Sequence, residues 1–247
     1  MPLLNEFSIQ LYSVREETAK DFPGVLKKLG EIGYTGVEFA GYGGIPARDM
    51  KKYLDTYGLK SIGSHVNCQR LENNLDEELD YNRIIGTEYM VISSAVMGNR
   101  DEALAAAAFA NKVGERCLKA GFGFAYHNHD KEFVKDGGDY LLDIFFANVD
   151  ASICKMELDL YWAAFAGVDP IDYMQRNNAR LRLLHIKQIR DYESRQCVDL
   201  GDGVIDFKTV VTRGKEYGVE HFILEQEEFA VSAFESVKNG FDHIMSL

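Results

Sequence analysis

The sequence lacks the features that mark secreted, membrane-spanning and metal-knuckle proteins. Its first six residues show no basic stretch followed by a long apolar run, so we expect no signal peptide. The Ala-rich run at 103–110 is far shorter than the roughly 20 apolar residues that span a bilayer, and we expect no membrane partner. The four cysteines form no CxxC pair, which favours reduced thiols in a cytoplasmic protein over a disulfide framework or a zinc knuckle. They are Cys68, Cys117, Cys154 and Cys197.

Basic charge and linker sequence are also scarce. With 27 Lys and Arg against 39 Asp and Glu, the formal net charge is −12, which argues against a surface that binds phosphate backbones. We therefore expect no nucleic-acid partner. No Pro/Ser-rich or low-complexity tract divides the 247 residues, a length close to the roughly 250 residues of one (β/α)8 barrel. We interpret residues 1–247 as a single domain whose 46% hydrophobic content is enough for a large core.

Short apolar runs alternate with amphipathic segments from one end of the chain to the other. This alternation is typical of repeated βα units around a parallel sheet. Eight units in this order predict an α/β fold, a closed (β/α)8 TIM barrel. An open doubly wound sheet is the competing architecture, but the glycines at 41–44 lack the GxGxxG spacing of its phosphate-binding turn. The runs that we expect to be strands are residues 7–11, 36–39, 60–66, 89–92, 122–126, 153–158, 181–186 and 222–224.

Side chains of metal-ligand type recur where five of the predicted strands end. In a (β/α)8 barrel the active site lies at the carboxyl ends of the strands, so these side chains should meet at one mouth. They are His65 on the third strand, His127, His129 and Glu132 after the fifth, Glu157 and Asp159 on the sixth, His185 and Lys187 on the seventh, and Glu225 and Glu227 after the eighth.

Several of these residues also have a plain structural interpretation. Asp159 could be the N-cap of the following helix, and Glu225 could be a solvated charge just past a buried strand. Arg15, just beyond the first strand, could be a solvated surface charge. Lys187 follows His185, and we expect strand alternation to point its side chain away from the barrel interior unless the strand ends there. The joint recurrence at one end of the barrel favours a functional site.

Carboxylates together with an imidazole suit a divalent ion that prefers oxygen ligands. Mn²⁺, Mg²⁺ and Co²⁺ fit such a set, and Zn²⁺ is less favoured because no thiolate accompanies it. One such ion can hold adjacent hydroxyl and carbonyl oxygens of a sugar. It then stabilises the enediolate that forms when a base removes the proton alpha to the carbonyl. We therefore expect one divalent metal ion per chain.

The motifs, taken in order, resemble those of the xylose isomerase-like TIM barrels grouped as sugar phosphate isomerases/epimerases. That group includes inosose dehydratase and ketose 3-epimerases. The resemblance covers nearly the whole chain, and its most specific stretch is YHNHDKEF at residues 126–133. The other matching stretches are residues 9–15, 36–39, 64–66, 157–163, 166–170, 185–187, 201–206 and 223–226.

Members of this family commonly hold one divalent metal ion through Glu, Asp, His and Glu from the last four strands. Where many relatives carry the first glutamate, at the end of strand five, this chain has Ala125 and Tyr126. The nearest substitute is Glu132, and His127 or His129 could also contribute. The resemblance thus implies the metal ligands Glu132, Asp159, His185 and Glu225.

The resemblance also implies an isomerase or epimerase of carbohydrate metabolism whose substrate is a small carbohydrate or keto-sugar. A carboxylate, Glu225 or Glu132, would remove the proton alpha to the carbonyl. His65 or His127 would shuttle a proton at the opposite face of the substrate. The residues expected to contact substrate are Arg15, His129, Lys187 and Trp162.

Three other functions compete with this one. A keto-inositol or keto-sugar dehydratase is the nearest, because it begins with the same proton abstraction. An endonuclease IV-like DNA repair enzyme needs further ligands and a cationic groove, and the net charge of −12 disfavours it. A non-catalytic sugar-binding barrel is favoured by the missing glutamate of strand five. The sequence leaves the exact substrate, its phosphorylation, the identity of the metal and the oligomeric state open.

Overall fold

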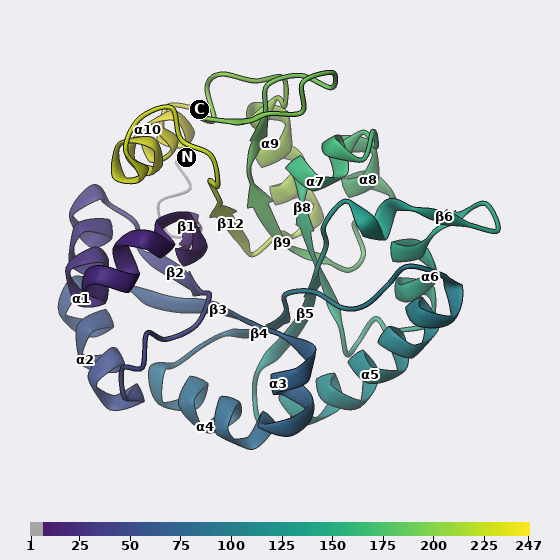
Figure 1. Cartoon of the computed structure of the whole chain (residues 1–247), viewed down its shortest axis with the longest axis horizontal. Coiled ribbons are helices and arrows are strands. Elements are labelled where there is room, and N and C mark those ends of the chain that lie inside the picture. The colour runs from purple at the N-terminus through teal and green to yellow at the C-terminus, as the bar shows by residue number, and fades with distance from the viewer. Residues whose placement is uncertain (1–6) are drawn as a thin grey trace.

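The computed structural model describes residues 7–247, so the expectation about a signal peptide falls outside the described residues. Its barrel strands are β1 (Phe7–Gln10), β2 (Gly36–Phe39), β3 (Lys60–Val66), β4 (Tyr89–Ile92), β5 (Gly123–His127), β8 (Lys155–Asp159), β9 (Leu181–Ile186) and β12 (His221–Leu224). All pair in parallel and close into a barrel in the order β1-β12-β9-β8-β5-β4-β3-β2. Figure 1 shows these strands at the centre with the helices around them. The predicted (β/α)8 TIM barrel is confirmed.

The predicted apolar runs correspond closely to the observed strands. The bounds of β2, β3, β4 and β9 are those predicted. β5 and β8 each extend one residue further than predicted, to His127 and Asp159. Both polar residues therefore belong to the sheet itself, where backbone pairing fixes their position.

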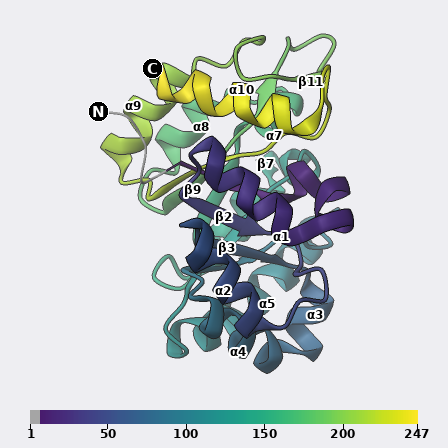
Figure 2. The same cartoon turned by 90° about the vertical axis from the view of Figure 1, so that its left-hand side faces the viewer.

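The helices surround the barrel and bury their apolar stripes against it. They are α1 (Arg15–Ile32), α2 (Ala47–Tyr57), α3 (Cys68–Asn73), α4 (Leu75–Ile85), α5 (Arg100–Lys119), α6 (Leu141–Ala147), α7 (Leu160–Phe165), α8 (Pro170–Arg176), α9 (Phe207–Tyr217) and α10 (Ala233–Met245). The view turned by 90° shows α1 and α2 along one side of the barrel, with α10 above them (Figure 2). No helix within residues 7–247 is long and apolar enough to cross a membrane.

Local sequence signals explain where several helices begin and end. Gly33 ends α1 with a φ of 120°, a left-handed conformation that glycine adopts without strain. Asn99 begins α5 by accepting a hydrogen bond from the backbone N–H of Glu102, which is one of the two hydrogen bonds of a capping box. Glu102 in return accepts from the backbone N–H of Gly98, one residue before the position that a capping box would use.

The loops beyond the barrel carry small additional elements. The loop after β1 forms the 3-10 helix η1 (Leu11–Val14). The segment after β5 contains the 3-10 helix η2 (Lys131–Phe133) and a two-stranded ribbon, β6 (Lys135–Asp136) with β7 (Asp139–Tyr140). The segment after β9 forms a second ribbon, β10 (Gln188–Ile189) with β11 (Cys197–Val198).

The two faces of the barrel strands carry separate apolar clusters. Alternate strand residues, such as Phe222 and Leu224 of β12, belong to the main core under the helices. Because neighbours along a strand point to opposite faces, the residues between them point into the barrel and form a smaller, separate cluster. Its members are Ile62, Tyr89, Val91, Ala125, Leu183 and Ile223.

We predict that replacing Ile223 by alanine lowers the free energy of unfolding by about 2–4 kcal/mol, because it leaves a cavity inside the barrel. The matched control is Ile84→Ala, since Ile84 is 42% exposed whereas Ile223 is 0% exposed. The control should change the free energy of unfolding by less than about 1 kcal/mol. Urea denaturation of both variants checks the expectation, and equal losses in the two would contradict the described interior cluster.

Candidate functional site

Strand alternation places a polar layer directly above the apolar barrel interior. In β5, in β9 and just past β12, the residue two positions beyond an interior apolar residue is polar. Two positions along a strand return a side chain to the same face, so these polar side chains also point inward, at the mouth of the barrel. The pairs are Ala125 with His127, Leu183 with His185, and Ile223 with Glu225.

Four buried side chains at this mouth come close enough to hold one metal ion. Ligand atoms of His127, Asp159, His185 and Glu225 all lie within 4.8 Å of one another. Three of these residues are predicted ligands. The fourth, His127 on β5, is the histidine alternative for the glutamate that relatives carry on this strand. The set contains two carboxylates and two imidazoles.

Asp159 is both a helix cap and a candidate ligand. Its Oδ1 accepts a hydrogen bond of 2.9 Å from the backbone N–H of Trp162, which makes it the N-cap of α7. Its Oδ2 is buried and has no hydrogen-bond partner. A buried carboxylate oxygen without a partner is unfavourable, and a cation at this position would satisfy it. The residues present therefore fit a metal ion.

Each ring nitrogen of His185 faces a different pair of carboxylates. Nδ1 lies 3.2 Å from Oε2 of Glu225 and 3.7 Å from Oδ2 of Asp159. Nε2 lies 2.8 Å from Oε2 of Glu38 and 3.2 Å from Oε1 of Glu157. A metal-binding histidine commonly donates its other N–H to a carboxylate, which sets the tautomer and the ring orientation. His185 matches this arrangement, with Nδ1 towards the candidate metal ligands and Nε2 towards Glu38 and Glu157.

Glu38 is a site residue that the sequence analysis missed, and Glu157 is one that it named at the end of the sixth strand without a role. Both are fully buried. Nε2 of His65 lies 2.6 Å from Oε1 of Glu157 and 3.2 Å from Oε2 of Glu38, and Glu38 also accepts a 2.9 Å hydrogen bond from Gln10. A signal for both was present, because each glutamate stands between two apolar residues of a buried strand.

A second group of possible ligands overlaps the first. His65, His127, Glu157 and His185 also have ligand atoms within 4.8 Å of one another. The first group contains Glu225, a carboxylate that lines the cavity described below, whereas Glu157 does not line it. Each group has two members that line the cavity, but the first has two carboxylates to the second's one and contains three of the predicted ligands. We therefore take the first group as the candidate metal site.

The structure does not bring Glu132 to either group. Its side chain is fully buried, and Oε1 accepts a 2.9 Å hydrogen bond from the hydroxyl of Tyr126. Its Oε2 accepts one of 2.9 Å from the backbone N–H of His129. The turn through η2 directs the carboxylate to the loop after β5, where it holds the backbone of His129. Burial raises the pKa of Glu132.

Lys187 points towards the site, and the expectation that it would point away is wrong. It lies two residues beyond His185, so the two side chains share the interior face. Lys187 is fully buried, donates a hydrogen bond to Glu227, and lies 3.5 Å from Oε2 of Glu225. Its ammonium also lies 4.7 Å from the ring centroid of Trp162. Burial alone would lower the pKa of Lys187, but Glu225 and the other carboxylates raise it.

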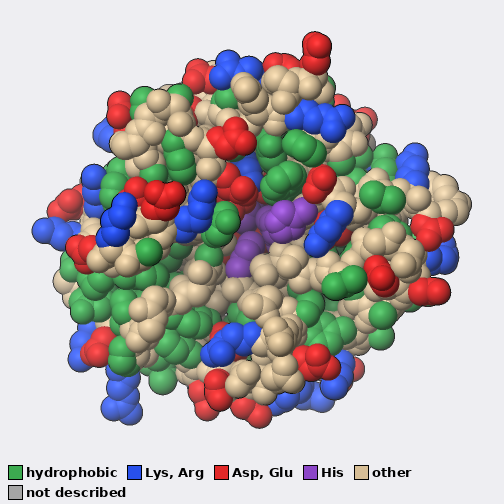
Figure 3. Space-filling view, viewed as in Figure 1, with side chains coloured by type: hydrophobic (Ala, Val, Ile, Leu, Met, Phe, Trp, Pro, Cys, Tyr) green, Lys and Arg blue, Asp and Glu red, His purple; other side chains and the backbone are tan. Residues whose placement is uncertain are grey.

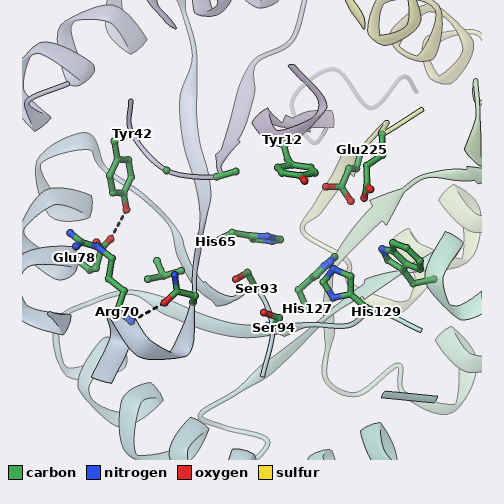
Figure 4. Close-up of a pocket in the computed structure, with 16 residues that line it drawn as sticks. Tyr12, Tyr42, His65, Arg70, Glu78, Ser93, Ser94, His127, His129 and Glu225 are labelled. Atoms are coloured by element: carbon green, nitrogen blue, oxygen red, sulfur yellow. Dashed lines mark hydrogen bonds and ion pairs between the residues drawn. The ribbon is translucent and has the colours of Figure 1, made fainter. Parts of the chain in front are cut away.

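A cavity of about 650 Å³ opens above these residues. The histidines gather in the hollow at the centre of the molecular face (Figure 3). Glu225, His127 and His129 lie on one side of the cavity and His65 near its middle (Figure 4). Trp162, with its ring centroid 5.4 Å from that of His129, also lines the cavity. The predicted site residues His65, His127, His129 and Glu225, which lie on or just past β3, β5 and β12, thus line the same cavity.

Arg15 meets the cavity only through its neighbour Tyr12. Its guanidinium carbon lies 4.5 Å from the ring centroid of Tyr12, and Nη1 donates a 3.0 Å hydrogen bond to the Tyr12 carbonyl. Tyr12 lines the cavity, whereas Arg15 is not among the lining residues.

Comparison with known proteins agrees with this geometry. The family model described as xylose isomerase-like TIM barrel matches residues 26–246. The chain belongs to the xylose isomerase-like TIM barrel family. Among curated proteins, it is similar to the rhizopine catabolism protein MocC of Rhizobium meliloti. The two are 23% identical over 243 residues, which cover 82% of this chain and 73% of MocC.

Solved structures share the fold over nearly the whole chain. A sugar phosphate isomerase/epimerase from Parabacteroides distasonis is 26% identical with a TM-score of 0.83, and the match covers 96% of this chain and 93% of that one. The IolI protein, whose structure contains a zinc atom, is 14% identical with a TM-score of 0.72 and 98% coverage of both chains. At that identity the second likeness shows the fold alone.

For several buried groups of the site, pairing with an opposite charge shifts the pKa more than burial does. Burial alone would lower the pKa of His65, but Glu38 and Glu157 raise it to about 10. Burial and the neighbouring Glu38 favour protonation of Glu157, yet His185 and His65 lower its pKa to about 2. Asp159 differs, because burial raises its pKa and the nearby cations offset only part of that effect. Without a metal, His65 and Glu157 are therefore both charged at neutral pH.

These shifts predict a pH window for the stability of the metal-free protein. The pKa of His65 is raised, so its contribution is complete below about pH 6.5, the unfolded value, and is lost as the pH rises towards 10. The pKa of Glu157 is lowered, so its contribution is complete above about pH 4.3 and is lost as the pH falls towards 2. In urea denaturation with chelator, the stabilisation that the His65–Glu157 pair contributes should therefore be greatest between about pH 4.5 and 6.5.

The variant His65→Asn provides the control for this window, because it removes the group responsible for the alkaline decline. Its free energy of unfolding should fall less than that of the wild type between pH 7 and pH 10. A wild type that becomes more stable over this range would show that the pairing of His65 with the two glutamates is absent.

Proposed function

We propose that the protein is a metal-dependent isomerase or epimerase that acts on a small carbohydrate or keto-sugar. The observation that supports this most directly is the ligand group of His127, Asp159, His185 and Glu225, of which His127 and Glu225 line the cavity. A cavity of about 650 Å³ lies within the range of roughly 300–1,000 Å³ typical of small-molecule sites. The likeness to a sugar phosphate isomerase/epimerase agrees with this reaction class.

The proposed metal ligands are His127, Asp159, His185 and Glu225, with His127 in place of Glu132. The unpartnered Oδ2 of Asp159 and the outward Nδ1 of His185 supply two of the ligand atoms. Two carboxylates with two imidazoles suit Mn²⁺, Co²⁺ or Zn²⁺ better than Mg²⁺, which prefers oxygen alone. The zinc atom of IolI belongs to a structure that shares only the fold. A divalent ion held here would act as a Lewis acid that stabilises negative charge developing on a substrate oxygen.

Glu225 is the proposed base that removes the proton alpha to the carbonyl. It lines the cavity, and its Oε1 makes no hydrogen bond to any described residue, whereas Oε2 faces His185 and Lys187. Burial alone would raise the pKa of Glu225, but Lys187 and His185 hold it well below the usual value, so it is ionised. The same lowered pKa makes it a weaker base, and its proposed role rests on its position in the cavity. Glu132, the other candidate base, has both oxygens engaged and does not line the cavity.

His65 and His127 are placed to exchange a second proton within the cavity. Both line it, and their ring centroids lie 4.8 Å apart. His65 carries a proton because Glu38 and Glu157 raise its pKa, whereas burial and the charge on His185 lower the pKa of His127. The pair therefore offers one donor and one acceptor. If His127 binds the ion, His65 alone serves as the donor.

His129 and Trp162 are the proposed substrate contacts with the best support. Both line the cavity, and Nδ1 of His129 and Nε1 of Trp162 are buried without hydrogen-bond partners. Lys187 acts through Glu225 and Glu227, whose positions it holds. Arg15 acts through Tyr12, against whose ring it rests.

A dehydratase is the second candidate, and one observation favours it. A lyase reaction needs an acid that protonates the leaving hydroxyl group, and the charged His65 of β3 lies near the middle of the cavity (Figure 4). The first step, removal of the alpha proton by Glu225, is common to both reactions. Identification of the product separates the two.

We predict that the purified wild type retains about one divalent ion per chain after reloading with Mn²⁺ or Co²⁺, and that His185→Asn and Asp159→Asn lose it. Glu132→Gln should retain the ion, because Glu132 lies outside the ligand group. The matched control is His221→Asn, since His221 belongs to a barrel strand but pairs with Glu88. Elemental analysis after dialysis provides the measurement. A wild type without metal under every condition, or equal retention in His185→Asn, would show that the ligand set is wrong.

We predict that turnover in D₂O places deuterium on the alpha or epimerised carbon and that chelation stops the exchange. Glu225→Gln should lower turnover by about 100-fold or more, the usual contribution of a general base. Mass spectrometry and NMR of the product provide the measurement. Turnover without deuterium on carbon would instead indicate a shielded proton transfer or a hydride shift. Full turnover by the metal-free protein would exclude the mechanism altogether.

A further inference from the structure

The cavity continues beyond the proposed metal ligands to a second wall that the mechanism does not use. Tyr42, Arg70 and Glu78 form this wall, on the opposite side of the cavity from Glu225 and His127 (Figure 4). These residues come from the loop after β2, from α3 and from α4, whereas the proposed ligands follow β5, β8, β9 and β12. One end of a bound molecule would therefore meet the metal ligands and the other end this far wall.

Glu78 anchors the far wall. It is 1% exposed, and its two oxygens accept hydrogen bonds from Nε of Arg70 and from the Tyr42 hydroxyl, the latter at 2.7 Å. The same hydroxyl is 2.7 Å from the Asn82 amide and 2.8 Å from the Ser64 hydroxyl. The Tyr42 ring also stacks on Tyr81 at a centroid distance of 3.9 Å. Glu78, itself buried and hydrogen-bonded at both oxygens, thus orients the guanidinium of Arg70, whose side chain is 47% exposed to the cavity and solvent.

The polar atoms that remain at this wall can form hydrogen bonds with a ligand. Nη1 of Arg70 makes no hydrogen bond to any described residue, and the side-chain hydroxyls of Ser93 and Ser94 make none within residues 7–247. All three residues line the cavity. A guanidinium and two hydroxyls match a run of sugar hydroxyl groups, which both donate and accept hydrogen bonds.

The charge balance at the far wall disfavours a phosphate. The positive charge of Arg70 is offset by Glu78 in direct contact and by Glu77, whose carboxylate lies 3.7 Å from Nη2. Arg70 is also the single Lys or Arg among the described residues that line the cavity, which include three glutamates. A phosphate dianion placed here would meet two carboxylates beside one cation, whereas neutral hydroxyls carry no such penalty.

We propose that this wall is a subsite for the uncharged polyhydroxyl end of the substrate, and that the enzyme acts on an unphosphorylated sugar or cyclitol. Arg70 is the specificity-determining residue, and Glu78 is the positioning residue that orients it and excludes anions. The inference rests on the proposed function for the position of the reacting carbon. The binding of neutral polyols at Arg70 can be measured without turnover.

The first experiment measures ligand binding to the Mn²⁺-loaded protein by calorimetry. The probes are D-fructose, D-psicose and scyllo-inosose, together with D-fructose 6-phosphate and inorganic phosphate. A neutral probe should bind to the wild type, and Arg70→Ala and Arg70→Lys should weaken it by about 10- to 100-fold, the value of hydrogen bonds from a charged donor. The matched control Arg83→Ala should bind as the wild type does, because Arg83 is exposed and, within residues 7–247, forms its ion pair with Asp80 alone.

The second experiment tests the exclusion of anions. Glu78→Gln removes one of the two carboxylates, so affinity for D-fructose 6-phosphate should rise relative to the wild type. For any converted neutral substrate, Arg70→Ala should raise KM with less than about a threefold change in kcat, because binding rather than chemistry is affected. Metal content should remain that of the wild type.

Several results would overturn the subsite. They are tighter binding of the phosphate ester than of its neutral parent, unchanged binding in Arg70→Ala, and the absence of binding by every neutral probe to the metal-loaded wild type. The same titration is repeated on the protein without added Mn²⁺. Binding of neutral probes through Arg70 in a protein that takes up no Mn²⁺ and exchanges no deuterium would retain the subsite and refute the proposed function. The two conclusions therefore fail separately.

Discussion

Two carboxylates inside the barrel, those of Glu38 and Glu157, lie between the imidazoles of His65 and His185, and the rest of the site depends on this pairing. An ion buried without its partner costs roughly 3–5 kcal/mol, so neither glutamate could remain charged alone. The four residues come from β2, β3, β8 and β9 and therefore connect separate parts of the barrel wall. The same contacts orient His185, which turns its other nitrogen towards the proposed metal position.

The site is layered along the barrel axis. An apolar layer seals the interior, the paired histidines and glutamates lie above it, and Glu225 forms the boundary with the cavity. Lys187 supports this boundary from the side, with its charge shared between Glu225 and Glu227 and its stem buried beside Trp162. Water is thereby kept away from all but the uppermost groups, which strengthens electrostatic interactions among them.

The order of strands around the barrel also separates chemistry from recognition. Groups that can bind a cation or move a proton follow the later strands, while the loops after β2 and β3 supply the Arg70 wall. His65, on β3, lies between the two sides and belongs to both (Figure 4). A ligand that spans the cavity is therefore held at two ends by groups of different chemistry.

The barrel and the edge at which the site lies could be predicted from the amino-acid sequence, because apolar periodicity is a local property and parallel strands end at a common edge. The sequence also placed Asp159, His185 and Glu225 correctly at that edge, since their positions depend only on where each strand ends.

Which side chains meet at that edge depends on how the chain packs in three dimensions. Glu38 and Glu157 stand inside apolar strands, and their partners belong to strands brought alongside by closure of the barrel. Glu132 has the right charge, but the turn after β5 directs it to Tyr126 and His129 instead. Side-chain partners result from long-range packing and loop conformation, and neither can be predicted from the apolar periodicity of the sequence.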